Sequence, residues 1–293
     1  MPPKKLYKVL KWNGDTEWFQ SEKLANSLKR SGASDEIIQR IVSHVEQELE
    51  DGMKTSEIYQ HAFDLLKKNT PVVAARYDLK QAIMRLGPSG YPFEKFVGSI
   101  WKRLGYKVKT GVMVPGRCIE HEVDVVAEND KEILMMECKY HNYHDTQSDI
   151  KTALYVHARM EDLKSYWEKK HRHTGKKFKG YLVTNTKFSH TALQYAECVG
   201  LNVISWSYPN GQGLAKIIDR VGLHPVTCLT TLTEGHIKTL LDQGNVLCRD
   251  AVENIKSLHL SPEDQARVEQ EAMQLCQLPP RSKKAQAPVV ALS

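Results

Sequence analysis

Two short strand-like segments in the middle of the chain restrict its fold more than any other part of the sequence. Residues 122–126 read Glu-Val-Asp-Val-Val, and residues 135–139 read Met-Met-Glu-Cys-Lys. Successive side chains of a strand point to opposite faces, so Glu137 and Lys139 share one face and Cys138 lies on the other. A short turn can join the two segments. The pattern therefore predicts two adjacent strands that place Asp124 beside Glu137.

Two neighbouring carboxylates repel each other unless a cation lies between them. Hard divalent ions such as Mg²⁺ or Mn²⁺ bind oxygen ligands, so we expect Asp124, Glu137 and the backbone carbonyl of Cys138 to hold a metal ion. A bound ion lowers the pKa of a water molecule. The Lys139 ammonium would orient that water and neutralise negative charge that develops beside it. The pattern is typical of metal-assisted hydrolysis.

Glu94 is a further candidate for the same site. The apolar spacing over residues 92–104 predicts an amphipathic helix, and at 100° per residue Glu94 lies beside its buried stripe. A carboxylate in that position needs a partner, which a metal ion or its water would provide. The alternative is a surface glutamate that pairs with Lys95 or Lys102.

The surrounding pattern predicts a mixed α/β sheet with helices on its faces. After the helix at 92–104, strands are expected at 106–112, 119–127 and 132–140, a helix at about 147–169, a strand at 180–184, a helix at 189–199 and a strand at 201–206.

In this order, the elements resemble the PD-(D/E)xK nuclease domain of Mrr-like (type IV) restriction endonucleases. The resemblance covers most of residues 88–210 and includes the segments 91–96, 104–106 and 183–189. It implies a restriction-endonuclease-like fold, endonuclease activity on DNA with Asp124, Glu137 and Lys139 as catalytic residues, and a role in defence against foreign DNA. In such nucleases a glutamate on the first helix often joins the metal site, and Glu94 occupies that place.

Two other functions are compatible with these motifs. The first is a nucleotide-responsive DNA-binding regulator in which the nuclease fold is inactive. The second is a nuclease that acts on branched DNA or on RNA.

The N-terminal segment predicts a small β-hairpin followed by four helices. Strand-like residues at 6–11 and 18–19 flank an Asn-Gly turn, which is a strong hairpin signal. Helices follow at 22–31, after Ser34 and after Thr55 as N-caps, and from Thr70-Pro71 onward.

This segment resembles an ATP-cone, the nucleotide-binding module at the N-terminus of many ribonucleotide reductases, over about residues 5–86. The matching segments are 9–14, 17–24 and 52–58. The resemblance implies that ATP or dATP binds as an allosteric ligand, and that the chain is a homo-oligomer whose assembly responds to it. By position, the nucleotide-binding residues are Val9, Lys11, Trp12, Glu17, Lys23 and Thr55.

The physical chemistry of these positions agrees with a phosphate ligand. Lys11 and Lys23 supply positive charge, and the start of the Thr55 helix offers free N–H groups. Trp12 stands where the family usually has a second basic residue, which either changes phosphate affinity or substitutes ring stacking for charge. The alternative is a protein-interaction domain that has lost its ligand.

Positive charge is concentrated in the middle of the chain. The whole sequence carries a net charge of +6, and its densest basic stretch is 169–179. We expect that stretch to follow a nucleic-acid backbone without reading its sequence, unless it is only a solvated loop. The expected contacts are Lys169, Lys170, Arg172, Lys176 and Lys177.

Composition and breaker residues divide the chain into four expected parts. These are an ATP-cone regulatory domain at 1–87, a nuclease domain at 88–222, a small helical domain at 223–278 and a disordered tail at 279–293. No stretch has the length and hydropathy of a membrane helix or a signal peptide, so a cytoplasmic protein is expected. Six scattered cysteines without a paired motif indicate reduced thiols.

Overall fold

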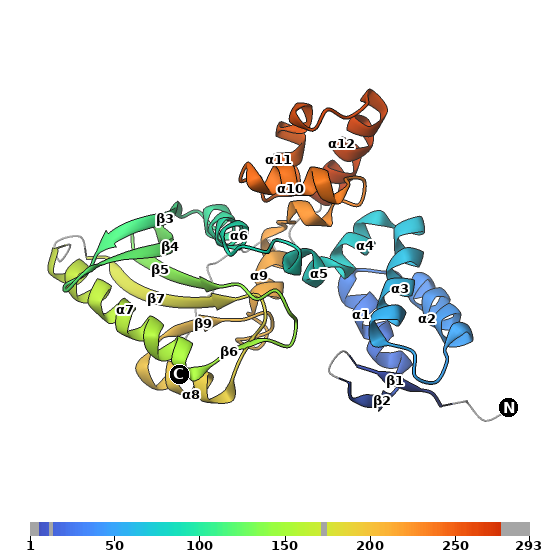
Figure 1. The fold of residues 1–293 in the computed structure, drawn as a ribbon, viewed down its shortest axis with the longest axis horizontal. Helices are drawn as coiled ribbons and strands as arrows, with labels where there is room; N and C mark the ends of the chain where they lie inside the picture. The colour runs from blue at the N-terminus through green and yellow to red at the C-terminus, as the bar shows by residue number, and fades with distance from the viewer. Residues whose placement is uncertain (1–5, 12–13, 171–174, 277–293) are drawn as a thin grey trace.

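The computed structural model describes residues 6–11, 14–170 and 175–276. A mixed sheet with its helices lies at one end of the molecule and a small hairpin-and-helix unit lies at the other (Figure 1). A group of C-terminal helices packs above the junction between them (Figure 1). The expected tail and residues Trp12 and Arg172 fall outside the described residues.

The N-terminal unit has the predicted hairpin and helices around a core of its own. In the hairpin, Lys8 pairs with Trp18. Ser34 caps its helix as expected, since its hydroxyl accepts a hydrogen bond from the Ile37 amide at 3.4 Å. The apolar spacing of these helices buries residues such as Leu28, Ile41 and Leu66 in one cluster. The elements are β1 (Lys8–Leu10), β2 (Thr16–Trp18), α1 (Ser21–Ser31), α2 (Asp35–Glu48), α3 (Thr55–Asn69) and α4 (Pro71–Tyr77).

Two details of these helices differ from the sequence expectation. Thr55 is the first residue of α3 rather than its N-cap; Lys54 takes the N-cap position, and its amide donates to the Glu57 carboxylate at 2.9 Å. The fourth helix is divided at Asp78 into α4 and α5 (Leu79–Met84). The Asp78 carboxylate is buried and accepts hydrogen bonds from Tyr59 and Arg85, so side chains from outside the helix hold the break.

The central sheet has the order β3-β4-β5-β7-β9, antiparallel through β5 and parallel beyond it. Helix α6 precedes the first strand, α7 crosses from β5 to β7, and α8 crosses from β7 to β9. A small pair, β6 with β8, lies beside the sheet. The bounds are α6 (Tyr91–Arg103), β3 (Lys107–Pro115), β4 (Glu120–Glu128), β5 (Glu132–Lys139), β6 (Gln147–Ser148), α7 (Ile150–Lys170), β7 (Lys177–Thr184), β8 (Lys187–Phe188), α8 (His190–Val199) and β9 (Asn202–Ile204).

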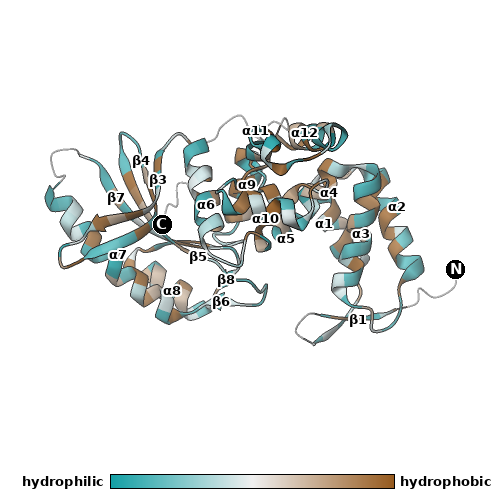
Figure 2. Cartoon of the chain, turned by 45° about the horizontal axis from the view of Figure 1, so that its top comes forward, coloured by the Kyte–Doolittle hydropathy of each residue, from teal (hydrophilic) through white to brown (hydrophobic). Residues whose placement is uncertain are grey.

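Helices cover both faces of this sheet, and the apolar segments lie on the strands and at the junction (Figure 2). On β5, Leu134 and Met136 enter the cluster shared with α6, whereas Ile133 and Met135 enter the cluster shared with α7. A Cβ added at Gly98 of α6 would lie 2.9 Å from the Thr110 methyl group, so this glycine allows the helix to approach the sheet closely. Between Ile133 and Met136 the central strand is therefore apolar on both faces.

The C-terminal helices share the core of the sheet rather than forming a separate one. The buried cluster that contains Phe93 and Met136 continues without interruption to Leu240, Ala251 and Leu275. The elements are α9 (Leu214–Val221), a 3₁₀ turn (Val226–Cys228), α10 (Glu234–Asp242), α11 (Cys248–Glu253), a second 3₁₀ turn (Ile255–Leu258) and α12 (Pro262–Cys276). Ser261 precedes α12, and its hydroxyl accepts a hydrogen bond from the Asp264 amide at 3.1 Å.

All six cysteines are free, as the sequence predicted; three are buried and three are exposed. Among the residues that the structure describes, no helix combines the length and the hydropathy required to span a membrane.

The buried carboxylate at the helix break should contribute measurably to stability. Asp78→Ala leaves the Tyr59 hydroxyl and the Arg85 guanidinium without their shared acceptor. Because a buried polar group without a partner costs about 1–3 kcal/mol, we expect the free energy of unfolding to fall by that amount in urea titrations. Asp64→Ala, an exposed carboxylate on α3, is the matched control and should change it by less than about 0.5 kcal/mol. Equal losses in the two variants would contradict this role of Asp78.

Candidate active site

The register of β4 and β5 brings the predicted acidic residues together. Val125 pairs with Met136, so the next positions along the two antiparallel strands are Asp124 and Glu137. An Asp124 carboxylate oxygen accepts a hydrogen bond from the Cys138 amide at 2.6 Å. Glu137 is buried, with 5% of its surface exposed. The two carboxylates thus occupy neighbouring strands at the point where the apolar core ends.

Glu137 is held by two cations. Its Oε1 lies 2.7 Å from the Lys139 Nζ, and its Oε2 lies 2.5 Å from the Arg159 Nη1. The second terminal nitrogen of Arg159 donates to the carbonyl of Glu122 on β4. The contact between Glu137 and Lys139 follows from their shared strand face, as expected.

Arg159 is a site residue that the sequence reasoning missed. It lies on α7 within a run whose buried positions are Val156, Met160 and Leu163, and its side chain is 13% exposed. A cation beside the buried stripe of a helix requires an acid partner, and that was the available signal. Only the packing of α7 on the sheet identifies Glu137 as the partner.

Glu94 approaches the same carboxylates from α6. Burial raises its pKa to about 7, with further contributions from the negative charges of Asp124, Glu122 and Glu137. The pKa of Asp124 is raised to about 6, first by burial and then by Glu137. A Cβ at Gly90 would lie 3.2 Å from the Glu94 Oε1, so a larger residue at this position would crowd the carboxylate. Glu122, exposed on β4, is another acidic neighbour that the sequence reasoning did not select.

This donor set fits a hard divalent cation in its chemistry. Carboxylates whose pKa is raised by burial and by one another are stabilised when a cation replaces the proton. In this structure, however, Glu94, Asp124 and Glu137 do not form a group in which one ligand atom from each residue lies within 4.8 Å of the others. Glu137 is instead paired with Lys139 and Arg159. An ion bound by Glu137 would therefore compete with Arg159.

Cys138 presents its backbone, not its thiol, to this site. The thiol is buried in the cluster on the α6 face, and burial raises its pKa well above the ordinary value. The amide donates to Asp124. The use of its carbonyl as a metal ligand stays a prediction.

The two histidines that follow the strand are occupied by other contacts. His141 Nε2 lies 3.0 Å from the Ser148 hydroxyl, and His144 Nε2 lies 2.7 Å from Gln81 Oε1 on α5. Burial lowers the pKa of both imidazoles. His141 therefore lies at the edge of the site, and His144 lies at the junction with the N-terminal unit.

The proposed nucleotide residues meet at one end of the N-terminal unit. Glu17 lies 2.9 Å from the Lys11 ammonium and 3.0 Å from that of Lys23, and the hydrogen bonds from Lys11 and then Lys23 lower its pKa. The Leu10 amide donates to Met53 at 3.0 Å, which places the end of β1 beside the start of α3 at Thr55. The side chain of Val9 is buried in the core below.

The predicted nucleic-acid contacts that the structure describes lie far from the acidic cluster. Lys177 pairs with Glu132 at the start of β5, and Glu137 lies five residues further along, about 16 Å at 3.3 Å per residue. Lys176 forms an ion pair with Glu128 at 2.7 Å, and Lys169 and Lys170 are exposed at the end of α7. The structure therefore does not join this stretch to the carboxylates, and a single bound molecule would have to span the sheet to contact both.

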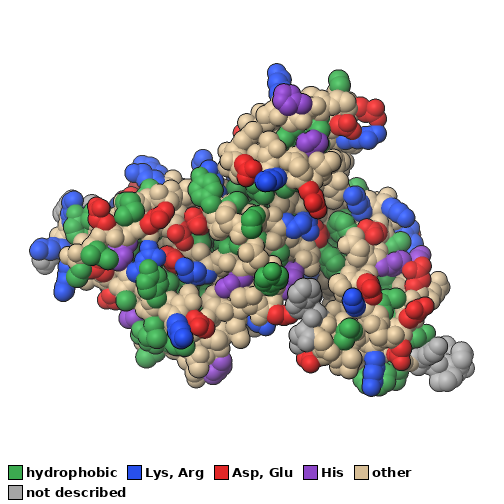
Figure 3. All heavy atoms as spheres, viewed as in Figure 1, with side chains coloured by type: hydrophobic (Ala, Val, Ile, Leu, Met, Phe, Trp, Pro, Cys, Tyr) green, Lys and Arg blue, Asp and Glu red, His purple; other side chains and the backbone are tan. Residues whose placement is uncertain are grey.

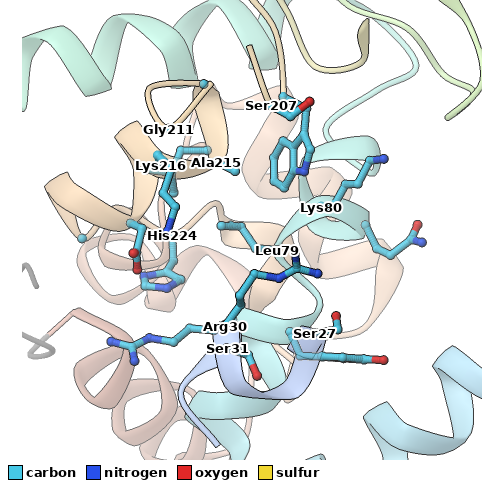
Figure 4. Close-up of a pocket in the computed structure, with 18 of the residues that line it drawn as sticks. Ser27, Arg30, Ser31, Leu79, Lys80, Ser207, Gly211, Ala215, Lys216 and His224 are labelled. Carbon is cyan, nitrogen blue, oxygen red and sulfur yellow. The ribbon is translucent and has the colours of Figure 1, made fainter. Parts of the chain in front are cut away.

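A cavity of about 670 Å³ lies between the N-terminal unit and the sheet domain. Arg30, Lys80, Lys216 and His224 are drawn around it in Figure 4. Arg30 comes from α1, Lys80 from α5 and Lys216 from α9, so the cavity is lined by both units and by the helix between them.

Comparison with known proteins assigns each part of the chain to a family. The ATP cone domain model matches residues 7–81, a restriction endonuclease model of the Mrr catalytic type matches residues 87–217, and the model "AF1548-like, C-terminal" matches residues 224–276.

Two similar proteins extend this assignment. An uncharacterized protein of Archaeoglobus fulgidus is 38% identical over 172 residues, which are 57% of this chain and 92% of that protein. The crystal structure of AF1548, described as a protein of unknown function, superposes with a TM-score of 0.52 at 34% identity and covers 64% of this chain and 98% of its own.

A third match is weaker. The restriction endonuclease MspJI in complex with a 27-mer oligonucleotide aligns with a TM-score of 0.35 at 15% identity over 58% of this chain and 35% of its own, too low to support any argument. The chain belongs to the AF1548-like family, with an ATP-cone joined to a restriction endonuclease domain of the Mrr type.

Proposed function

We propose that this protein is an endodeoxyribonuclease that depends on Mg²⁺ or Mn²⁺ and is regulated by ATP or dATP bound to its ATP-cone. The observation that carries the proposal is the junction of β4 and β5, where Asp124, Glu137 and Lys139 meet beside Glu94. The negative charge of buried carboxylates has to be balanced by cations. The match to a restriction endonuclease model supports the proposal that one of these cations is a catalytic metal ion.

In this proposal Asp124 and Glu137 hold the ion, with the Cys138 carbonyl and Glu94 as further oxygen donors. The ion would supply an activated water molecule and a positive charge near the scissile phosphate. Lys139, whose ammonium contacts Glu137, would neutralise the negative charge that grows on that phosphate. Arg159 keeps the buried Glu137 paired when no ion is bound.

The two ion pairs of Glu137, with Lys139 and with Arg159, favour one other function. Both of its oxygens are satisfied by Lys139 and Arg159 without a metal ion, as they would be in a nuclease fold that only binds DNA. A nucleotide-responsive DNA-binding regulator is therefore the second candidate. A cleavage assay with and without divalent ion separates the two, because only the enzyme converts the DNA.

Regulation by the cone has a direct route to the site. The Tyr140 hydroxyl donates to the Met84 carbonyl at 2.5 Å and accepts from the Gly87 amide at 2.8 Å. Tyr140 follows Lys139 in the chain, and its ring lies 5.7 Å from that of Phe93, the neighbour of Glu94. A movement of α5 would therefore reach both Lys139 and Glu94.

An oligomer is part of the proposal. A nuclease that cuts both strands of DNA needs two active sites, which two copies of the chain supply. A nucleotide changes their assembly only if it prefers one state over the other. We propose a homo-oligomer whose assembly, and hence double-strand cleavage in defence against foreign DNA, follows the bound nucleotide.

The catalytic assignment predicts loss of cleavage without loss of folding. Asp124→Asn, Glu137→Gln and Lys139→Met should each lower the cleavage rate by at least about 100-fold, as expected when charge stabilisation of the transition state is removed. Chelation should abolish wild-type cleavage of supercoiled and linear DNA, and Mg²⁺ should restore it. Glu120→Gln, an exposed acid on β4, should cleave at the wild-type rate. Undiminished cleavage by all three variants would remove the site.

The nucleotide assignment predicts stabilisation by ligand. ATP or dATP at 100 times its dissociation constant should stabilise the full chain by about 2.7 kcal/mol against unfolding. Lys23→Ala removes a phosphate contact and should reduce the rise in melting temperature. Lys29→Ala, at the other end of the same helix, should retain it. If neither nucleotide shifts the melting temperature at millimolar concentration, the cone has lost its ligand.

The route through Tyr140 predicts a variant that separates binding from response. Tyr140→Phe removes the hydroxyl that joins Met84 and Gly87 but keeps the ring. We expect nucleotide binding to persist, while the ratio of cleavage rates with and without nucleotide moves towards one. Tyr143→Phe, an exposed neighbour, should preserve the ratio. A wild-type ratio in the Tyr140 variant would exclude this route.

A further inference from the structure

Two histidines and a glutamate converge on the surface of the ATP-cone. His44 and Glu48 lie one turn apart on α2, and His61 faces them from α3. One ligand atom from each can be chosen so that all three lie within 4.8 Å of one another. Among the described residues of this chain, His44, Glu48 and His61 form the one group of three or more His, Cys, Asp or Glu side chains with ligand atoms this close together.

The three side chains already contact one another. His61 Nε2 lies 3.1 Å from His44 Nδ1, His44 Nδ1 lies 3.5 Å from Glu48 Oε1, and His61 Nδ1 lies 3.4 Å from Glu48 Oε2. With bonds of about 2.0–2.1 Å to a tetrahedral zinc ion, neighbouring ligand atoms lie about 3.3 Å apart. An imidazole binds an ion through a single nitrogen, and the close contacts of His61 use both of its nitrogens. The His61 ring therefore has to turn to bring the three ligand atoms, which lie within 4.8 Å of one another, around one ion.

Hydrogen bonding alone leaves the group loosely satisfied. A charge-assisted bond to a carboxylate is ordinarily about 2.7–2.9 Å long, and both contacts to Glu48 are longer. His121 provides the contrast in the same chain: it lies 2.8 Å from Asp162, which also accepts from the Cys118 and Ile119 amides. That pair is a completed structural contact, whereas the carboxylate of Glu48 is not drawn tightly to either imidazole.

We propose that His44, Glu48 and His61 bind a divalent transition-metal ion, with zinc as the best fit. Two imidazoles and one carboxylate are ligands that zinc accepts, and they leave a fourth position for water. The side chains are 44%, 53% and 32% exposed in the order His44, Glu48, His61, so an ion enters without unfolding. The ligand chemistry differs from the all-oxygen set at Asp124 and Glu137, which suits Mg²⁺.

The bound ion would fasten α2 to α3. His61 lies six residues beyond Thr55, about 9 Å along α3 at 1.5 Å per residue. The ion would thus fix the helix whose start belongs to the proposed nucleotide site. The site uses none of the residues assigned to cleavage or nucleotide binding. Metal binding at this site can therefore be tested independently of the proposed function.

The test uses the full chain, stripped with chelator and then titrated with Zn²⁺ by calorimetry and with Co²⁺ by visible absorption. The background variant Asp124→Asn/Glu137→Gln removes the other metal candidate. We expect one ion per chain, a tetrahedral Co²⁺ spectrum and a higher melting temperature with Zn²⁺. His44→Asn and His61→Asn should each weaken Zn²⁺ binding by about 100-fold. Removal of a residue that only supports a metal ligand already costs about 10- to 100-fold in affinity, and removal of a ligand should cost at least as much.

His157→Asn is the matched control, because His157 also faces a glutamate one turn away, Glu161, but forms no group of three among the described residues. It should bind Zn²⁺ as the background chain does. Circular dichroism establishes that each variant is folded, and Glu48→Gln supplies a variant of unchanged size that should also weaken binding. Unaltered stoichiometry and affinity in His44→Asn and His61→Asn, or binding lost equally in His157→Asn, would overturn the proposal.

Discussion

The burial of one carboxylate, that of Glu137, governs the centre of this molecule. Its strand, β5, is covered by helices on both faces, so a charge there has almost no access to water and must be paired. Lys139 supplies one partner from the same strand face, and Arg159 supplies the other from α7. Because Arg159 also binds the carbonyl of Glu122, the same contacts join β4, β5 and α7 at the end of the sheet.

The acidic cluster draws on both layers of helices around the sheet. Glu94 comes from α6 and Arg159 from the opposite layer, so neither layer alone contains the site. Apolar packing on the two faces positions these side chains, and it continues without interruption into the C-terminal helices. The AF1548-like C-terminal part thereby packs in the same cluster as the apolar face of α6, the helix that carries Glu94.

The cone is joined to this assembly differently. It has its own apolar core, and its connection to the rest of the chain includes α5. The hydroxyls of Tyr140 and Thr227 donate to backbone carbonyls of α5, and the Arg85 side chain donates to the Thr227 carbonyl. A cavity remains beside this junction (Figure 4). Charges of both signs are spread over the face of the molecule seen in Figure 3. The cone thus has a separate core, while Ala75 of α4 lies in the cluster that is shared with the sheet and the C-terminal helices.

The sequence by itself determined the order of helices and strands, the shared face of Glu137 and Lys139, and the position of Glu94 beside the buried stripe of its helix. These features follow from the repeat of the backbone, which acts over a few residues. Only the tertiary structure decided that α7 brings Arg159 to Glu137, that Asp78 divides the fourth helix, and that Lys177 lies at the far end of β5 from the carboxylates. Each of these depends on contacts between residues distant in the chain, which local periodicity does not encode.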